Sequence, residues 1–185
     1  MAIGLPSFSA AIANSRISAQ YNDTLGALFI ARSEAVKGSG RVTVCARGAG
    51  QTPSCKQGGG DWSDGIVVFQ DNAPVASDGD VVIGTEDSVV YLEPALSGDN
   101  TLSVRGSANN TAAGANAYSF VTYNPNGSTN WRGVAFTLCD DRGAEFGRAI
   151  NIVITGDIRR GRTPPGASAP LDTFGLPISC GGPNG

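Results

Sequence analysis

The sequence predicts an α+β fold in which one long N-terminal helix packs against an antiparallel β-sheet. Two observations support this fold class. Apolar side chains in residues 12–37 recur at the 3.6-residue spacing of a helix. From Arg41 onward, short runs of Val, Ile, Phe and Tyr are separated by turn sequences rich in Asn, Asp, Gly and Ser. We expect a single domain over 1–185, with a helix arm at 1–40, an antiparallel β region at 41–160 and an irregular tail at 161–185.

The predicted helix begins near a cap at Asn14 or Ser15, or earlier at Pro6, and ends at the glycines that follow Lys37. One stripe of its surface is expected to face the core, with Phe29 at the edge of that stripe. The members of this helix core face are Ile17, Tyr21, Leu25, Leu28, Ala35 and Val36.

Two further features of the helix concern its partners. Arg32 projects into the apolar face, where an unpaired charge is costly, so a carboxylate or carbonyl elsewhere in the chain should meet it, unless its stem lets the charged end reach water. Ile12, Ala19 and Ile30 lie in a row on the opposite face, which the sheet cannot cover. This row is expected to pack against another subunit's helix.

Seven strands are expected after the helix, in a meander that joins each strand to the next. The tail that follows is rich in Pro, Gly and Ser, and is expected to lie irregularly over the surface. The expected strands are Arg41–Ala46, Gly65–Gln70, Ser88–Glu93, Thr101–Arg105, Tyr118–Tyr123, Gly133–Asp140 and Ala149–Thr155.

The four cysteines indicate disulfides. Cys45, Cys55, Cys139 and Cys180 lack the CxxC spacing of a zinc ribbon or a thioredoxin-type pair. An even number of cysteines in a glycine-rich chain favours disulfides and an oxidising compartment. We favour Cys45 with Cys55, and Cys139 with Cys180, which would pin the tail, although the sequence alone leaves all three pairings open.

The composition excludes several kinds of chemistry. The chain contains no histidine, so the commonest general base and metal ligand is missing. Its net charge of −3 provides no basic field for nucleic acid. The acidic pairs Asp140–Asp141 and Asp61–Asp64 are read as solvated turn residues rather than as a catalytic dyad, and we expect no enzymatic activity. Trp62 and Trp131 are read as strand-edge packing residues rather than as platforms on which a ligand stacks.

One loop offers oxygen ligands for a calcium ion. Asp71, Asn72, Asp78 and Asp80 lie within ten residues of one another. The twelve-residue calcium loop with its terminal glutamate is not visible, so ordinary turn chemistry is the preferred interpretation. We expect no metal and no cofactor.

Four stretches of the chain resemble a known family. They are Leu28–Lys37 (LFIARSEAVK), Arg41–Cys45 (RVTVC), Asp61–Asp71 (DWSDGIVVFQD) and Phe136–Arg159 (FTLCDDRGAEFGRAINIVITGDIR). The chain is similar in these stretches, and over most of residues 3–159, to the GspH/FimT/FimU group of minor pilins and pseudopilins. The resemblance implies a pilin fold and a structural subunit that joins other minor pilins and the major pilin, and primes pilus assembly at the tip.

The resemblance also implies a location. Family members carry an apolar N-terminal segment that spans the inner membrane before assembly, with the domain facing the periplasm, and the assembled pilus lies on the cell surface. The present chain would then be a truncated soluble form, and the row of Ile12, Ala19 and Ile30 would be the face that packs on other pilin helices.

Two alternatives come from the same resemblance. The first is a pseudopilin at the tip of a type II secretion pseudopilus, with the same fold. The second is a minor pilin that binds DNA during natural transformation. DNA-binding members carry a GRxR motif after the last strand, and the aligned residues here are Gly156, Asp157, Ile158 and Arg159. The candidate phosphate contacts are Arg159, Arg160 and Arg162, whereas Asp157 would repel phosphate.

Overall fold

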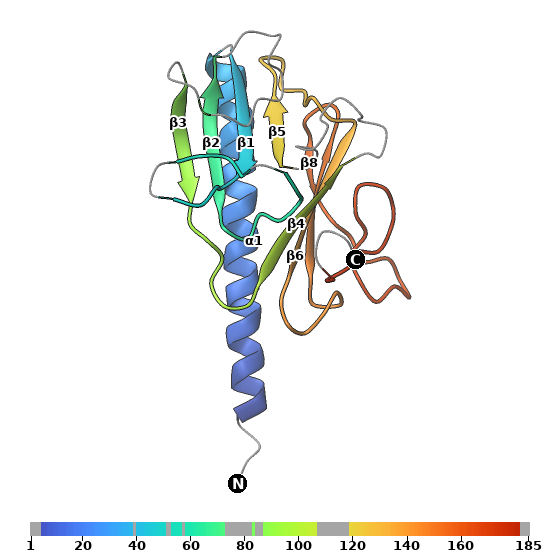
Figure 1. Ribbon diagram of the computed structural model, residues 1–185. Coiled ribbons are helices and arrows are strands. Elements are labelled where there is room, and N and C mark those ends of the chain that lie inside the picture. Colours follow the sequence, from blue (N-terminus) through green and yellow to red (C-terminus); the bar gives the residue numbers. More distant parts are fainter. Residues whose placement is uncertain are drawn as a thin grey trace.

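A computed structural model describes residues 5–38, 40–50, 53–56, 58–72, 83, 87–106 and 119–181. Its first element is a single α-helix, α1, that spans Leu5–Gly38. With 34 residues it is about 51 Å long at 1.5 Å per residue. Figure 1 shows that most of the helix lies against the sheets and their loops, while its N-terminal end projects beyond them. The helix therefore begins earlier than a cap at Asn14 or Ser15 would place it.

The strands form two antiparallel sheets of four strands each. The first sheet has the order β3-β2-β1-β5 and lies along α1 (Figure 1). The second has the order β4-β6-β7-β8. The strands of the first sheet are β1 (Arg41–Ala46), β2 (Ile66–Asp71), β3 (Ser88–Glu93) and β5 (Phe120–Tyr123). Those of the second are β4 (Thr101–Gly106), β6 (Gly133–Cys139), β7 (Arg148–Val153) and β8 (Ile158–Arg160).

The α+β class and the long helix are confirmed, but the single meander is not. β5 pairs with β1, so that Val44 faces Val121, instead of continuing from β4. Both faces of β1 and β2 are buried, which explains why their residues read as continuous apolar runs and why the sequence does not reveal their neighbours. The short strand β8 was not expected at all. It consists of only three residues, two of which are arginines.

The buried stripe of α1 differs in part from the expected one. Ile17, Tyr21, Leu28 and Ala35 are buried as expected, and Leu25 is partly buried against the same cluster. Val36 was expected in the stripe but is 52% exposed, because it lies beyond the line of buried residues. The stripe is completed by small or polar residues, which allow the sheet to approach the helix closely. These are Gln20, Thr24, Ala27 and Ala31.

Two tryptophans join the layers of the core. Trp62 is fully buried, and its ring meets the ring of Phe136 edge-on, with 5.0 Å between centroids. Trp131 is buried beside Phe120, with 6.0 Å between centroids. Since Phe136 belongs to β6 and Phe120 to β5, aromatic packing ties both sheets into one core. These residues are interior packing groups rather than strand-edge residues.

Two disulfides hold the loops, in the pairings that the sequence favoured. Cys45 pairs with Cys55, and Cys139 pairs with Cys180 across 41 residues of chain. The second bridge ties the end of the tail to β6. Among the described residues there is no free cysteine. The tail also carries its own small cluster, in which Ala169 and Ile178 pack against Ala149 of β7.

Candidate assembly surface and arginine sites

The projecting N-terminal end of α1 exposes large apolar side chains. Phe8 is 68% exposed and Ile12 is 50% exposed, and Ala19 continues the exposed surface toward the sheets. Figure 1 shows this part of the helix extending away from both sheets. We name Phe8, Ile12 and Ala19 the helix row. Isolated exposed apolar residues are ordinary, but three on one face of a projecting helix are typical of a contact surface.

The expected third member of that row lies differently. Ile30 is only partly exposed, because the helix at that height is flanked by the sheet. Phe29 and Val36, each about half exposed, are the large apolar residues that α1 presents there. Phe29 and Val36 lie to one side of the line through Ile12 and Ala19, so they form a second exposed apolar strip near the C-terminal end of α1.

Polar contacts fix the helix relative to the sheets below this surface. Arg142, in the β6–β7 loop, donates a hydrogen bond to the Asn14 side-chain oxygen at 2.9 Å. Gln20 donates to the Ser97 carbonyl at 3.0 Å, and its own side-chain oxygen accepts a hydrogen bond from Asn100. Loops from two parts of the chain therefore hold α1 between residues 14 and 20. These contacts fix the direction in which the helix row faces relative to the two sheets.

The expected partner of Arg32 is present. The Arg32 guanidinium lies 3.2 Å from the Asp157 carboxylate and donates a second hydrogen bond to the Thr155 carbonyl at 3.3 Å. Between these partners, Gly156 has a φ of 76°, and a Cβ there would lie 1.8 Å from the Gly127 carbonyl oxygen. Only glycine fits at this close approach, which brings the β7–β8 turn against the β5–β6 loop beside Arg32.

The three arginines proposed for DNA all border one hollow of the surface, but they do not present their charges on one face. Arg159 and Arg160 lie within β8 rather than beyond the last strand. Arg160 faces Ile150 across the ladder, whereas Arg159 faces Asn151. Because adjacent residues of a strand point to opposite faces, the two guanidinium groups diverge. Arg160 lies over the Tyr21 ring of α1, at 5.6 Å from its centroid, and Arg159 lies 3.7 Å from Asp157.

Three of the four carboxylates in the two acidic pairs are bound to cations. The Lys56 ammonium lies 2.7 Å from Asp61 and 3.0 Å from Asp64. Asp140 is buried and accepts hydrogen bonds from the Arg142 guanidinium at 2.6 and 3.0 Å. Although burial raises the pKa of Asp140, the hydrogen bonds from Arg142 outweigh it and hold the pKa below its ordinary value. Both sites are ion-paired turns.

Half of the calcium candidate set lies outside the described residues, namely Asp78 and Asp80. Asp71 is buried at the end of β2 and faces Arg41, whose guanidinium lies 3.3 Å from its carboxylate. Thr43 donates a further hydrogen bond to the same carboxylate. The Asp71 oxygens are thus already engaged by neighbouring strands, and no metal-ligand cluster exists among the described residues.

A long helix that projects from the antiparallel sheet packed along it defines the class of pilin-like filament subunits. A family model described as "Type II transport protein GspH" matches residues 20–157, and the chain belongs to this family of minor pilins and pseudopilins. No curated protein matches the sequence. In the described residues, no helix combines the length and apolarity needed to cross a membrane.

Solved structures share the fold. The crystal structure of the type IV minor pilin FimU from Pseudomonas aeruginosa matches with a TM-score of 0.54 and 17% identity, covering 90% of this chain and 96% of that one. The minor pseudopilin EpsH of the Vibrio cholerae Type 2 Secretion System matches with a TM-score of 0.47 and 8% identity. It covers 82% of this chain and 98% of EpsH.

Proposed function

We propose that this chain is a structural minor pilin of a type IV pilus, which primes assembly at the pilus tip together with other minor pilins. The helix row carries the proposal, since a rigidly held helix that exposes Phe8, Ile12 and Ala19 offers a surface for a neighbouring helix. The partners would be other minor pilins and the major pilin. The alternative is a pseudopilin of a type II secretion pseudopilus, which shares this fold and would use the helix row in the same way.

The same proposal includes a location. The subunit would be held at the inner membrane, facing the periplasm, before assembly, and would lie on the cell surface within the pilus afterwards. Two disulfides support an oxidising compartment of this kind.

Co-purification with candidate minor pilins tests the proposal. Ile12→Asp and Ala19→Asp should each abolish the complex, because a buried unpaired carboxylate in a helix interface is costly. Leu176→Asp and Ala95→Asp are matched controls, as Leu176 is about as exposed as Ile12 and Ala95 is an exposed alanine. Complexes that survive both helix substitutions, or that are lost equally with the controls, would contradict a role for the helix row.

A further inference from the structure

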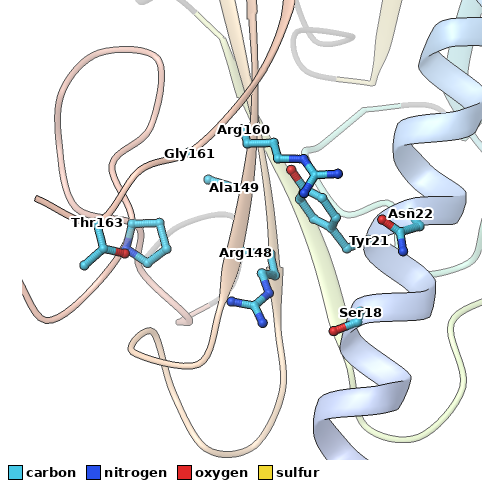
Figure 2. A pocket seen from close by; sticks show the side chains of 9 residues that line it. Ser18, Tyr21, Asn22, Arg148, Ala149, Arg160, Gly161 and Thr163 are labelled. Carbon is cyan, nitrogen blue, oxygen red and sulfur yellow. The ribbon is translucent and has the colours of Figure 1, made fainter.

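A cavity of about 340 Å³ lies where α1 meets β7, β8 and the tail. Figure 2 shows Tyr21 and Ser18 entering it from the helix, Arg148 and Arg160 from the strands, and Thr163 from the tail. Sequence reasoning grouped Arg160 with Arg159 and Arg162 and missed Arg148. The strand register explains the different grouping, since Arg160 faces Ile150, and Arg148 lies two residues from Ile150 on the same face of β7.

Tyr21 is the unusual member of this cavity. It is 94% buried, and its hydroxyl group has no hydrogen-bond partner. The hydroxyl points toward Arg160 and away from its own helix (Figure 2). Burial raises the pKa of Tyr21, an effect that the nearby charges of Arg160 and Arg148 partly offset. A buried hydroxyl that donates no hydrogen bond is destabilising. The group missing from this site is therefore a hydrogen-bond acceptor for the Tyr21 hydroxyl.

The two arginines cannot supply that acceptor. A guanidinium group only donates hydrogen bonds, and it remains charged at any physiological pH. Eight ion pairs join arginine or lysine side chains to carboxylates among the described residues. Neither Arg148 nor Arg160 takes part in any of them. Two exposed cations and a buried phenol hydroxyl therefore line one cavity, and no carboxylate of the described residues pairs with either cation.

We propose that this cavity binds a single carboxylate group, which the Arg148 and Arg160 guanidinium groups hold and to which Tyr21 donates its hydroxyl proton. Guanidinium forks match the geometry of a carboxylate. A polyanion fits less well, because the exposed carboxylates of Asp141 and Glu145 lie in the β6–β7 loop that leads into Arg148. An isolated acidic group enters the cavity without meeting them.

The source of the carboxylate is an aspartate or glutamate of a neighbouring subunit. The cavity opens beside α1 at Ser18 and Asn22, which lie on either side of Ala19 in the sequence. The neighbouring helix would therefore pack against the side of α1 that carries Ser18 and Asn22, next to the helix row, and bring an acidic side chain to the cavity. This source rests on the proposed function, whereas the affinity of the cavity for a carboxylate is a property of the isolated chain.

Nuclear magnetic resonance of the isolated chain tests the site without requiring any filament partner. The probe is the capped tripeptide acetyl-Ala-Glu-Ala-amide, and the same peptide with Gln is its neutral control. The glutamate peptide should shift the Nε–H signals of Arg148 and Arg160 saturably, and the glutamine peptide should not. The double variant Arg148→Gln/Arg160→Gln should lose this response, while Arg132→Gln, at an exposed arginine elsewhere, should retain it.

Tyr21→Phe separates a binding role from a packing role. It removes only the hydroxyl, so the free protein should keep its melting temperature or gain a few degrees, while peptide affinity falls about three- to tenfold. Equal shifts with both peptides, tighter binding of inorganic phosphate than of the glutamate peptide, or full binding by the double variant would each overturn the assignment. Loss of peptide binding with intact co-purification would refute the carboxylate site alone.

Discussion

The Asp157 carboxylate lies 3.2 Å from the Arg32 guanidinium, and this ion pair ties the β7–β8 turn to α1. The two residues are 125 positions apart in the chain. Asp157 also occupies the place at which DNA-binding relatives are expected to carry an arginine. In this chain the position serves the fold, since its side chain neutralises a cation that would otherwise stand unpaired on the helix beside the sheet.

The first prediction concerns this pair. Arg32→Gln and Asp157→Asn should each lower the free energy of unfolding, and a double-mutant cycle should give a coupling of about 0.5–1 kcal/mol. The coupling is modest because the two side chains are 33% and 48% exposed and solvent screens the pair. Chemical denaturation in low and high salt measures it. A coupling near zero at low salt would show that the Arg32 contact to the Thr155 carbonyl alone holds the turn.

The second prediction tests the buried stripe of α1. Leu28→Ala should lower the free energy of unfolding by about 2–5 kcal/mol, because Leu28 is fully buried and its removal leaves a cavity. Phe29→Ala, the adjacent and half-exposed position, should change it by less than about 0.5 kcal/mol. Urea unfolding followed by circular dichroism compares the two. Similar losses at both positions would mean that Phe29 also packs in the core.

The third prediction concerns the tail. Mass spectrometry of the unreduced protein should find no thiol that iodoacetamide can alkylate. Replacing Cys139 and Cys180 together by serine should expose residues 161–180 to proteolysis and cost about 2–5 kcal/mol, since the bridge closes a loop across 41 residues. Replacing Cys45 and Cys55 by serine is the control, because loss of that bridge leaves the tail attached through Cys139 and Cys180. Recovery of two free thiols would refute the oxidising-compartment argument.

The fourth prediction uses the pH dependence of Asp140. Asp140→Asn should lower the free energy of unfolding by about 1–3 kcal/mol at pH 7, because it removes charged hydrogen bonds to Arg142. The pKa of Asp140 is lower in the folded state, so the stabilisation is complete above its ordinary value of 3.8 and is lost as the pH falls below it. The difference between wild type and variant should therefore shrink below that pH. Asp141→Asn, at the exposed neighbour, should show no such trend.

The sequence predicts the fold class because its apolar residues recur with a period of 3.6 in the helix and of 2 in the strands. It also predicted that Arg32 would either meet a partner or reach water, since the cost of an unpaired charge on an apolar face is independent of topology. It could not name Asp157, because that depends on which turn reaches the helix. The prediction that Val36 is buried was wrong for a similar reason, because hydrophobicity does not indicate how far along the helix the sheet extends.

The sites were harder to predict than the fold. Small side chains such as Ala27 and Ala31 carry little hydrophobic signal, although they are the points of closest packing. The cavity at Tyr21 depends on the register that sets Arg160 opposite Ile150, and no local pattern encodes a pairing between strands. The alternation of side chains within β8 could have warned that Arg159 and Arg160 diverge, but so short a strand was not expected.

The last prediction concerns DNA. Three arginines on one surface would give a slope of log K against log salt near −2.7, at roughly −0.9 for each neutralised phosphate. Arg160 borders the same hollow as Arg159 and Arg162, but its guanidinium lies over the Tyr21 ring, so we count only Arg159 and Arg162 as phosphate contacts. We therefore expect weak, sequence-independent binding with a slope of about −1.8 or shallower, measured by mobility shift at several salt concentrations.

The choice of variant decides whether that experiment can be interpreted. Asp157→Arg restores the arginine of the expected motif, but it also removes the partner of Arg32 and sets a second cation beside it. It should lower the melting temperature as well as change the charge. Arg159→Gln combined with Arg162→Gln is the cleaner test, since both side chains are exposed and the Arg32 pair stays intact. Tight, salt-sensitive binding by the wild type that this double variant abolishes would make DNA capture the leading function. An unchanged weak shift in the double variant would remove these arginines from consideration and leave the filament role as the proposal to pursue.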